Sequence, residues 1–277
     1  MTLSANRRTR GFGYLDVIVV IGVLVLVVAF FLPTRRHTGE TSSRVKCASN
    51  LRQIGTGLLL YANENGRAYP RMRHDETAGV RYYTGSKDTN PFDGVNDPLP
   101  NDITAAIFLL VRTQDMGTEV FTCPSAQEER FSPSDALSNY ANFPGRKHLS
   151  YAIANPYPSA ALVGTGYKWD NTLGPEFAVA ADMGSGVDQS KFTVKSPVID
   201  INKRANSKNH SQDGQNVLFG DGHVEFTNTP LAGVNKDNIY APSAGPVAAP
   251  GTADASLPPG VAPQHADDSV LIPTEKD

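Results

Sequence analysis

The longest apolar run of the chain lies close to its N-terminus. Residues 15–32 read LDVIVVIGVLVLVVAFFL, and their only charge is Asp16. An α-helix rises about 1.5 Å per residue, so this segment would extend about 27 Å, just enough to cross a hydrocarbon core of about 30 Å. Pro33 follows, and proline interrupts a helix because it lacks an N–H group and clashes with the preceding turn. The pattern predicts a membrane-spanning helix.

A secretory signal peptide is the first alternative for this segment. Its basic start would be Arg7, Arg8 and Arg10. A signal peptide ends at a small-x-small cleavage site, whereas this run ends in Phe30, Phe31 and Leu32, without such a pair. The sequence therefore favours an apolar segment that is retained.

A second helical pattern follows the polar residues 34–40. Threonine and serine at positions 41–43 are suitable N-caps. Apolar side chains then recur at three- and four-residue steps, at Val45, Cys47, Leu51, Ile54, Leu58 and Tyr61. Such a stripe predicts an amphipathic helix that packs on a sheet and ends at Asn65-Gly66. Residues 103–112 predict a shorter apolar helix, and residues 178–181 a short strand.

A hairpin is predicted near the C-terminus. Asp221-Gly222 lies between two apolar runs, and this dipeptide favours a two-residue turn because both positions tolerate positive φ. Such a turn would place Phe219 opposite Val224, on one face of the hairpin.

Composition narrows the function classes. The 277 residues carry a formal net charge of −3, so no basic excess indicates nucleic acid as a partner. Neither a nucleophile–base constellation nor a phosphate loop or dinucleotide motif appears, so we expect no enzyme and no cofactor. Residues 241–264 are rich in Ala, Pro and Gly and predict disorder. Residues 266–273 are left open between a short final strand and a continuation of that tail.

The junction between the basic start and the apolar run resembles the cleavage site of type IV prepilins and type II secretion pseudopilins. It reads Gly11-Phe12-Gly13-Tyr14-Leu15-Asp16, with Asp where the family usually has Glu. The resemblance implies that prepilin peptidase cuts between Gly11 and Phe12 and methylates the new N-terminus. It also implies that Asp16 pairs with the α-amino group of Phe12 on a neighbouring subunit. The alternative is that Asp16 is only a residue at a membrane interface.

Further motifs resemble the prepilin-type processing-associated His-x9-Asp-Gly proteins. They are CASNLRQIG at residues 47–55, FTCPS at residues 121–125, and His210 followed by Asp221-Gly222. The family spacer has nine residues, whereas ten separate His210 from Asp221 here.

Cys47 and Cys123 are the only cysteines. In an oxidising compartment they would be able to form a disulfide. The alternative is two buried free thiols, since cysteine is also among the most buried residue types.

Histidines and acids around the hairpin are candidate metal ligands. The set comprises His210, Asp213, Asp221 and His223. Imidazole and carboxylate suit a divalent ion. No established metal motif such as HExxH accompanies them, so the sequence favours turns at the two Asp-Gly pairs and a buried His210 that satisfies a backbone group.

Patterns and resemblance together predict an α+β, pilin-like fold. A long N-terminal helix, half transmembrane and half amphipathic, would pack on an antiparallel β-sheet with long loops. The expected parts are a leader (1–11), a transmembrane helix (12–33), a globular domain (34–240) and a disordered tail (241–277).

The predicted function is a pseudopilin-like subunit of a type II secretion or type IV pilus-like system. It would be single-pass in a bacterial inner membrane, with its C-terminal domain outside the cytoplasm. Its partners would be prepilin peptidase, other pilin-like subunits, the assembly machinery and the lipid bilayer. The alternatives are an anchored extracytoplasmic binding domain that does not polymerise, and a tethered metal-dependent hydrolase using His210 and Asp221.

Overall fold

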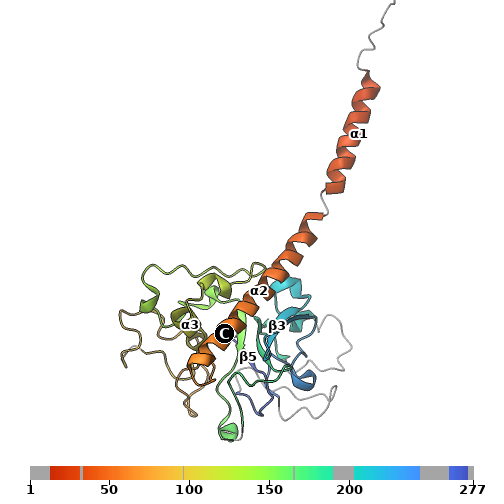
Figure 1. The fold of residues 1–277 in the computed structure, drawn as a ribbon. Coiled ribbons are helices and arrows are strands. Elements are labelled where there is room, and N and C mark those ends of the chain that lie inside the picture. The colour runs from red at the N-terminus through yellow and green to blue at the C-terminus, as the bar shows by residue number, and fades with distance from the viewer. Residues whose placement is uncertain are drawn as a thin grey trace, which may run out of the picture. The chain divides into compact units, whose positions relative to one another are not determined.

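The computed structural model describes residues 13–31, 34–95, 97–164, 166–189, 203–243 and 262–273. The chain divides into two compact units, Met1–Ser42 and Ser43–Asp277. Its α-helices are α1 (Tyr14–Phe31), α2 (Thr34–Glu64) and α3 (Ile103–Thr113) (Figure 1). Short 3₁₀ helices lie at Thr118–Phe121, Leu137–Asn139, Arg146–His148, Ala160–Leu162, Asn209–Gln212 and Val234–Lys236.

The expectation of one long, pilin-like N-terminal helix was wrong. The apolar segment α1 ends at Phe31 and the amphipathic segment α2 begins at Thr34. Neither helix alone has the length of a continuous pilin helix. The sequence carries Pro33 between them, and proline removes a backbone hydrogen bond and clashes with the turn before it.

The predicted single-pass location in an inner membrane is also contradicted. In the part of the chain that the structure describes, none of the helices has both the length and the apolar character needed to cross a membrane. The 18 residues of α1 correspond to about 27 Å at about 1.5 Å each, against a hydrocarbon core of about 30 Å.

A five-stranded antiparallel sheet forms the centre of the second unit. The strands are β1 (Tyr151–Ala154), β2 (Ala178–Asp182), β3 (Gln215–Phe219), β4 (Val224–Thr227) and β5 (Leu271–Ile272). Their order is β4-β3-β2-β1-β5. The α+β class and the antiparallel sheet agree with the sequence prediction.

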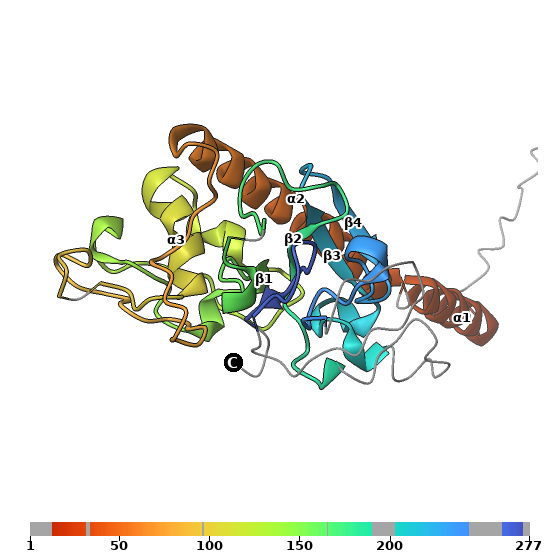
Figure 2. The ribbon, with the colours of Figure 1, turned by 90° about the horizontal axis from the view of Figure 1, so that it is seen from below.

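Helix α2 lies beside β3, as both ribbon views show (Figures 1 and 2). The apolar stripe predicted for it faces the core, and its fully buried members are Cys47, Leu51, Ile54 and Leu58. Gly55 permits the close approach to the sheet, because a Cβ atom there would lie 3.0 Å from a methyl carbon of Leu218. Val45 departs from the predicted stripe and is 65% exposed.

The hairpin is present, but its predicted register was wrong by one residue. Val224 lies opposite Leu218, not Phe219. Residues 220–222 therefore form a three-residue loop instead of a two-residue turn. Gly222 has a φ of +89°, in the left-handed region that commonly closes such loops.

Part of the predicted disordered tail belongs to the globular unit. Strand β5 pairs antiparallel with β1, with Ile272 opposite Ile153. Val270, Leu271 and Ile272 are buried. The domain boundary expected at residue 240 was therefore placed too early, and the alternative of a final strand holds. Residues 244–261 lie outside the described part.

Candidate functional site

Four residues from distant parts of the sequence meet inside the second unit. Cys47 lies on α2, Cys123 follows the 3₁₀ helix Thr118–Phe121, Asp182 ends β2, and His210 lies in the 3₁₀ helix Asn209–Gln212. All four are buried, and one ligand-type atom from each lies within 4.8 Å of the others. We refer to these residues as the buried cluster.

The structure joins Cys47 and Cys123 in a disulfide instead of leaving two free thiols. Their Cα atoms are 5.3 Å apart, and 76 positions separate them in the sequence. The bond attaches α2 to the segment that leads into β1. Ser150, just before β1, donates its backbone N–H to the carbonyl of Phe121 at 2.9 Å. The disulfide therefore connects the helix to the sheet through a short, hydrogen-bonded path.

His210 lies between the disulfide and Asp182. Its Nε2 atom is 3.3 Å from Oδ2 of Asp182 and 3.7 Å from Sγ of Cys123. The side chains of His210 and Asp182 are both 0% exposed. An ion pair or hydrogen bond between them is thus shielded from water. Electrostatic interactions are stronger in the protein interior than in water, because the interior has a lower dielectric constant.

Amide groups hold the carboxylate of Asp182 in place. Asn216 donates its backbone N–H at 2.7 Å and its side-chain Nδ2 at 3.0 Å to Oδ2. Asn209 donates from Nδ2 to Oδ1 at 3.4 Å. A buried carboxylate is costly unless it is hydrogen-bonded, and these donors supply that compensation.

Two tyrosines around the cluster remain protonated. Burial raises the pKa of Tyr151 well above its ordinary value, and the nearby Asp182 charge raises it further. Burial and the same charge raise the pKa of Tyr240 in the same way. Its hydroxyl donates to the backbone carbonyl of Asp182 at 2.6 Å. Neither phenol is therefore suited to act as a general base near neutral pH.

The four metal candidates of the sequence analysis are not brought together. Asp213 forms ion pairs with Arg44 at 2.8 Å and with Lys203 at 3.4 Å. Asp221 lies 2.5 Å from Nδ1 of its neighbour His223 in the exposed hairpin loop. Within the described ranges, only His210 of the four belongs to a group with metal-binding geometry.

The predicted cleavage site, Gly11 and Phe12, lies outside the described residues. Asp16 lies in the first turn of α1. Its Oδ2 atom accepts the backbone N–H of Gly13 at 2.9 Å. This contact satisfies one of the backbone donors left unpaired at the start of a helix, and a negative charge there also favours the helix dipole.

Asp182 and Asn216 were missed by sequence reasoning. Asp182 directly follows the small strand predicted at residues 178–181, and an acid at the end of an apolar run was the available signal. Nothing in the local pattern of either residue indicates His210 as the partner, because the contact depends on how β2 and β3 pair.

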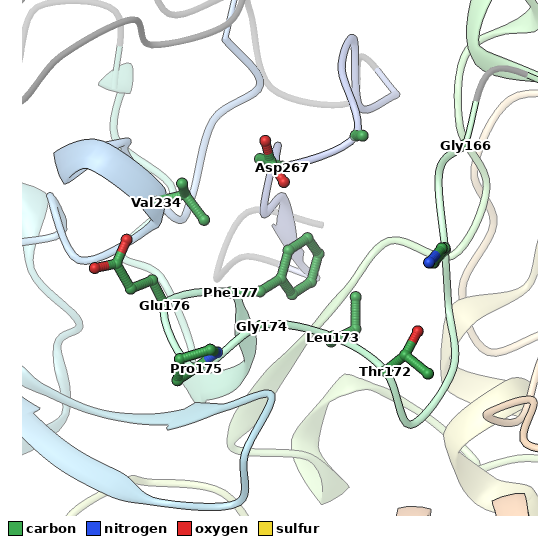
Figure 3. A pocket seen from close by; sticks show the side chains of 11 residues that line it. Gly166, Thr172, Leu173, Gly174, Pro175, Glu176, Phe177, Val234 and Asp267 are labelled. Carbon is green, nitrogen blue, oxygen red and sulfur yellow. The ribbon is translucent and has the colours of Figure 1, made fainter.

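A pocket of about 490 Å³ lies at the loops before β2 and before β5. Figure 3 shows Leu173, Phe177 and Val234 around the same space, with Asp267 across from Leu173. Its lining includes no histidine, cysteine or serine. The polar side chains of its lining are Lys168, Thr172, Glu176 and Asp267.

Comparisons of the chain with models of protein families, with curated proteins and with solved structures found no match. The resemblance to prepilin-type proteins therefore stays a prediction that rests on the chain's own motifs.

Proposed function

We propose that this protein is a non-enzymatic assembly subunit of a type II secretion or type IV pilus-like system. In this proposal a prepilin-type peptidase cuts it between Gly11 and Phe12, and copies then associate through α1. The observation that carries the proposal is the exposed apolar surface of α1. Its large apolar side chains from Leu15 to Val28 are between 44% and 76% exposed.

The apolar character of α1 extends around the whole helix. Its sequence, YLDVIVVIGVLVLVVAFF, has no polar face that could be turned to water. A helix that is apolar on every side is normally buried on every side. One docking groove would cover only part of it, whereas several parallel copies would surround it. The hydrophobic gain is about 25 cal/mol for each Å² of apolar surface removed from water.

Asp16 is suited to set the register between copies. It is the only charged residue of α1. Cleavage after Gly11 would create an α-amino group on Phe12, with an ordinary pKa of about 7.7 to 8.0. A carboxylate and an ammonium group that meet among apolar helices attract strongly, whereas an unpaired buried charge is strongly unfavourable. Only one axial stagger of neighbouring helices would pair every Asp16 with a neighbouring Phe12.

The first test is the mass and N-terminus of the protein produced with and without a prepilin peptidase. We expect a chain that begins at Phe12 and carries one added methyl group only when the peptidase is present. A chain that still begins at Met1 in the presence of the peptidase would reject the processing step.

The second test is assembly of the processed chain, measured by sedimentation and chemical cross-linking. We expect Asp16→Ala to reduce the assembled fraction at least about tenfold, because the α-amino group of Phe12 would then be a buried charge without its partner. Asp221→Asn removes an exposed acid far along the sequence and is the matched control, with no expected change. If Asp16→Ala assembles as well as the wild type, the charge pair does not set the register.

Neither alternative function is favoured by a specific observation. The hydrolase would need His210 and Asp221 in one site, but His210 is buried beside Asp182. Asp221 instead pairs with His223 in the exposed loop.

A further inference from the structure

We propose that the reduced form of this protein binds one zinc ion at the buried cluster, in place of the disulfide. The ligands would be the thiolates of Cys47 and Cys123, Nε2 of His210 and a carboxylate oxygen of Asp182. Zinc and disulfide are then alternative cross-links between α2 and the sheet. This inference does not depend on processing or assembly.

The donor set is of a kind that zinc prefers. Zinc is bound in proteins by thiolate, imidazole and carboxylate groups, and its structural sites are almost always tetrahedral. Thiolates are soft ligands, so they select zinc over magnesium or calcium. The four donor atoms already lie within 4.8 Å of one another.

Two of the distances between donors already match a zinc site. In a tetrahedron, bonds of about 2.0 Å to nitrogen and oxygen place these two atoms about 3.3 Å apart, and a bond of about 2.3 Å to sulfur places it about 3.5 Å from the nitrogen. The observed separations are 3.3 Å from Nε2 to Oδ2 of Asp182 and 3.7 Å from Nε2 to Sγ of Cys123. The main rearrangement required is separation of the two sulfur atoms to about 3.8 Å.

The surroundings would hold the ligands in place. Asn209 and the backbone N–H of Asn216 already hydrogen-bond to Asp182. Such contacts orient a ligating carboxylate and stabilise metal binding. The side-chain Nδ2 of Asn216 lies 3.2 Å from Nε2 of His210. This contact would be given up, since the ring nitrogen would then bind the metal.

The exchange balances in electrons, protons and charge. A dithiol reductant gives two electrons and two protons to the disulfide and becomes a disulfide itself. Zinc then displaces the two thiol protons into solution. Zinc ligands bind in their deprotonated forms, so Asp182 is counted as a carboxylate and His210 as a neutral imidazole. On this count the disulfide state carries a charge of −1, and zinc with two thiolates and one carboxylate also carries −1. The zinc form therefore buries no additional net charge, which would otherwise be costly.

Burial of the cluster determines when zinc would enter. Both cysteines are almost fully buried, at 0% and 1% exposure. The folded, oxidised chain therefore offers no accessible site, and metal would bind while the reduced chain folds. Metal binding of this kind contributes directly to folding free energy.

The experiment is a refolding of the full chain in two redox states. The protein is unfolded and its disulfide is reduced with a phosphine. It is then refolded without oxygen in the presence of zinc or cobalt, and its mass is measured by native mass spectrometry. We expect one metal ion per reduced chain and none per oxidised chain. The cobalt form should show the absorption of a tetrahedral site together with thiolate-to-cobalt charge transfer.

Variants then test the two ligands that are not cysteines. We expect His210→Ala and Asp182→Asn each to weaken metal binding at least about tenfold, since even outer-shell changes have effects of this size. His223→Ala and Asp221→Asn change the same residue types in the exposed loop and should leave binding unchanged. The wild-type comparison of redox states needs no variant, so it decides the proposal even if a substitution prevents folding.

Three results would overturn the proposal. The first is a reduced wild-type chain that holds no metal after refolding. The second is equal metal content in the oxidised and reduced chains. The third is unchanged metal affinity in His210→Ala, which would assign the metal to another site.

Discussion

Three consecutive residues in the left-handed region direct His210 toward the buried cluster. His210, Ser211 and Gln212 have φ values of 56°, 60° and 61°. This conformation costs roughly 1–2 kcal/mol for each residue other than glycine. The surrounding contacts must compensate for it, and the buried contact of His210 with Asp182 is one of them. The ion pairs of Asp213 follow directly after this turn and join it to Arg44 on α2.

Replacing Asp213 tests how much these ion pairs contribute. Burial opposes ionisation of Asp213, but hydrogen bonds from Lys203 and Arg44 hold its pKa below the ordinary value. The group therefore stabilises the fold above its unfolded pKa of about 3.9, and this contribution is lost as the pH falls through the folded pKa. Because the pairs are partly exposed, Asp213→Asn should cost less than about 1 kcal/mol at pH 7.

Urea unfolding at neutral pH and near pH 2 measures this difference. The wild type should be the more stable protein at neutral pH, and the two should converge in acid. An equal difference at both pH values would show that the substitution acts through packing and not through charge.

At the scale of elements, α2 is joined to the sheet by the disulfide and by close apolar packing. Gly55 brings the helix backbone near Leu218 of β3. Leu218 is 1% exposed. Arg44, also on α2, places its guanidinium 4.4 Å from the centre of the Phe226 ring on β4. The helix thus contacts both strands of the hairpin.

Leu218→Ala should destabilise the protein by about 2–5 kcal/mol, because it leaves a cavity between α2 and the sheet. Denaturant unfolding gives the free energy directly. Leu60→Ala is a matched control on α2, since Leu60 is 49% exposed and should change stability by less than about 0.5 kcal/mol. Similar losses for both variants would contradict the packing described for this face.

At the scale of the whole molecule, the second unit is completed by a segment near the chain's C-terminus. The backbone N–H of Asn155 donates to the carbonyl of Val270 at 2.8 Å, and the backbone N–H of Leu271 donates to the carbonyl of Ile239 at 2.7 Å. Residues 262–273 thus connect the edge of the sheet to the segment after β4. Without β5, the edge of β1 would expose unpaired backbone groups, which favours association with other chains.

A chain that ends at residue 261 should lose several kcal/mol of stability, because each of three buried apolar side chains contributes about 1.5–3 kcal/mol. Thermal and urea unfolding measure the loss. A synthetic peptide of residues 262–277, added to the shortened chain, should restore part of it. Unchanged unfolding of the shortened chain would mean that β5 adds nothing to the core.

Local patterns by themselves determined most of the elements. The stripe of apolar residues predicted α2, since a period of 3.6 residues needs no information from elsewhere in the chain. Asp221-Gly222 between two apolar runs predicted the hairpin, and Gly11-Phe12 with Asp16 supplied the functional prediction. Pro33 predicted an interruption after the apolar segment, although one long helix was still expected.

Only the tertiary structure decided the register of the hairpin, the extent of the globular unit and the buried cluster. A turn of two or three residues suits the same Asp-Gly sequence, and only the observed pairing of β3 with β4 distinguishes them. β5 has only two residues, too few for a recognisable pattern. The cluster joins Cys47, Cys123, Asp182 and His210 across four segments, and such contacts exist only once the strands have paired, because no local period relates residues so far apart.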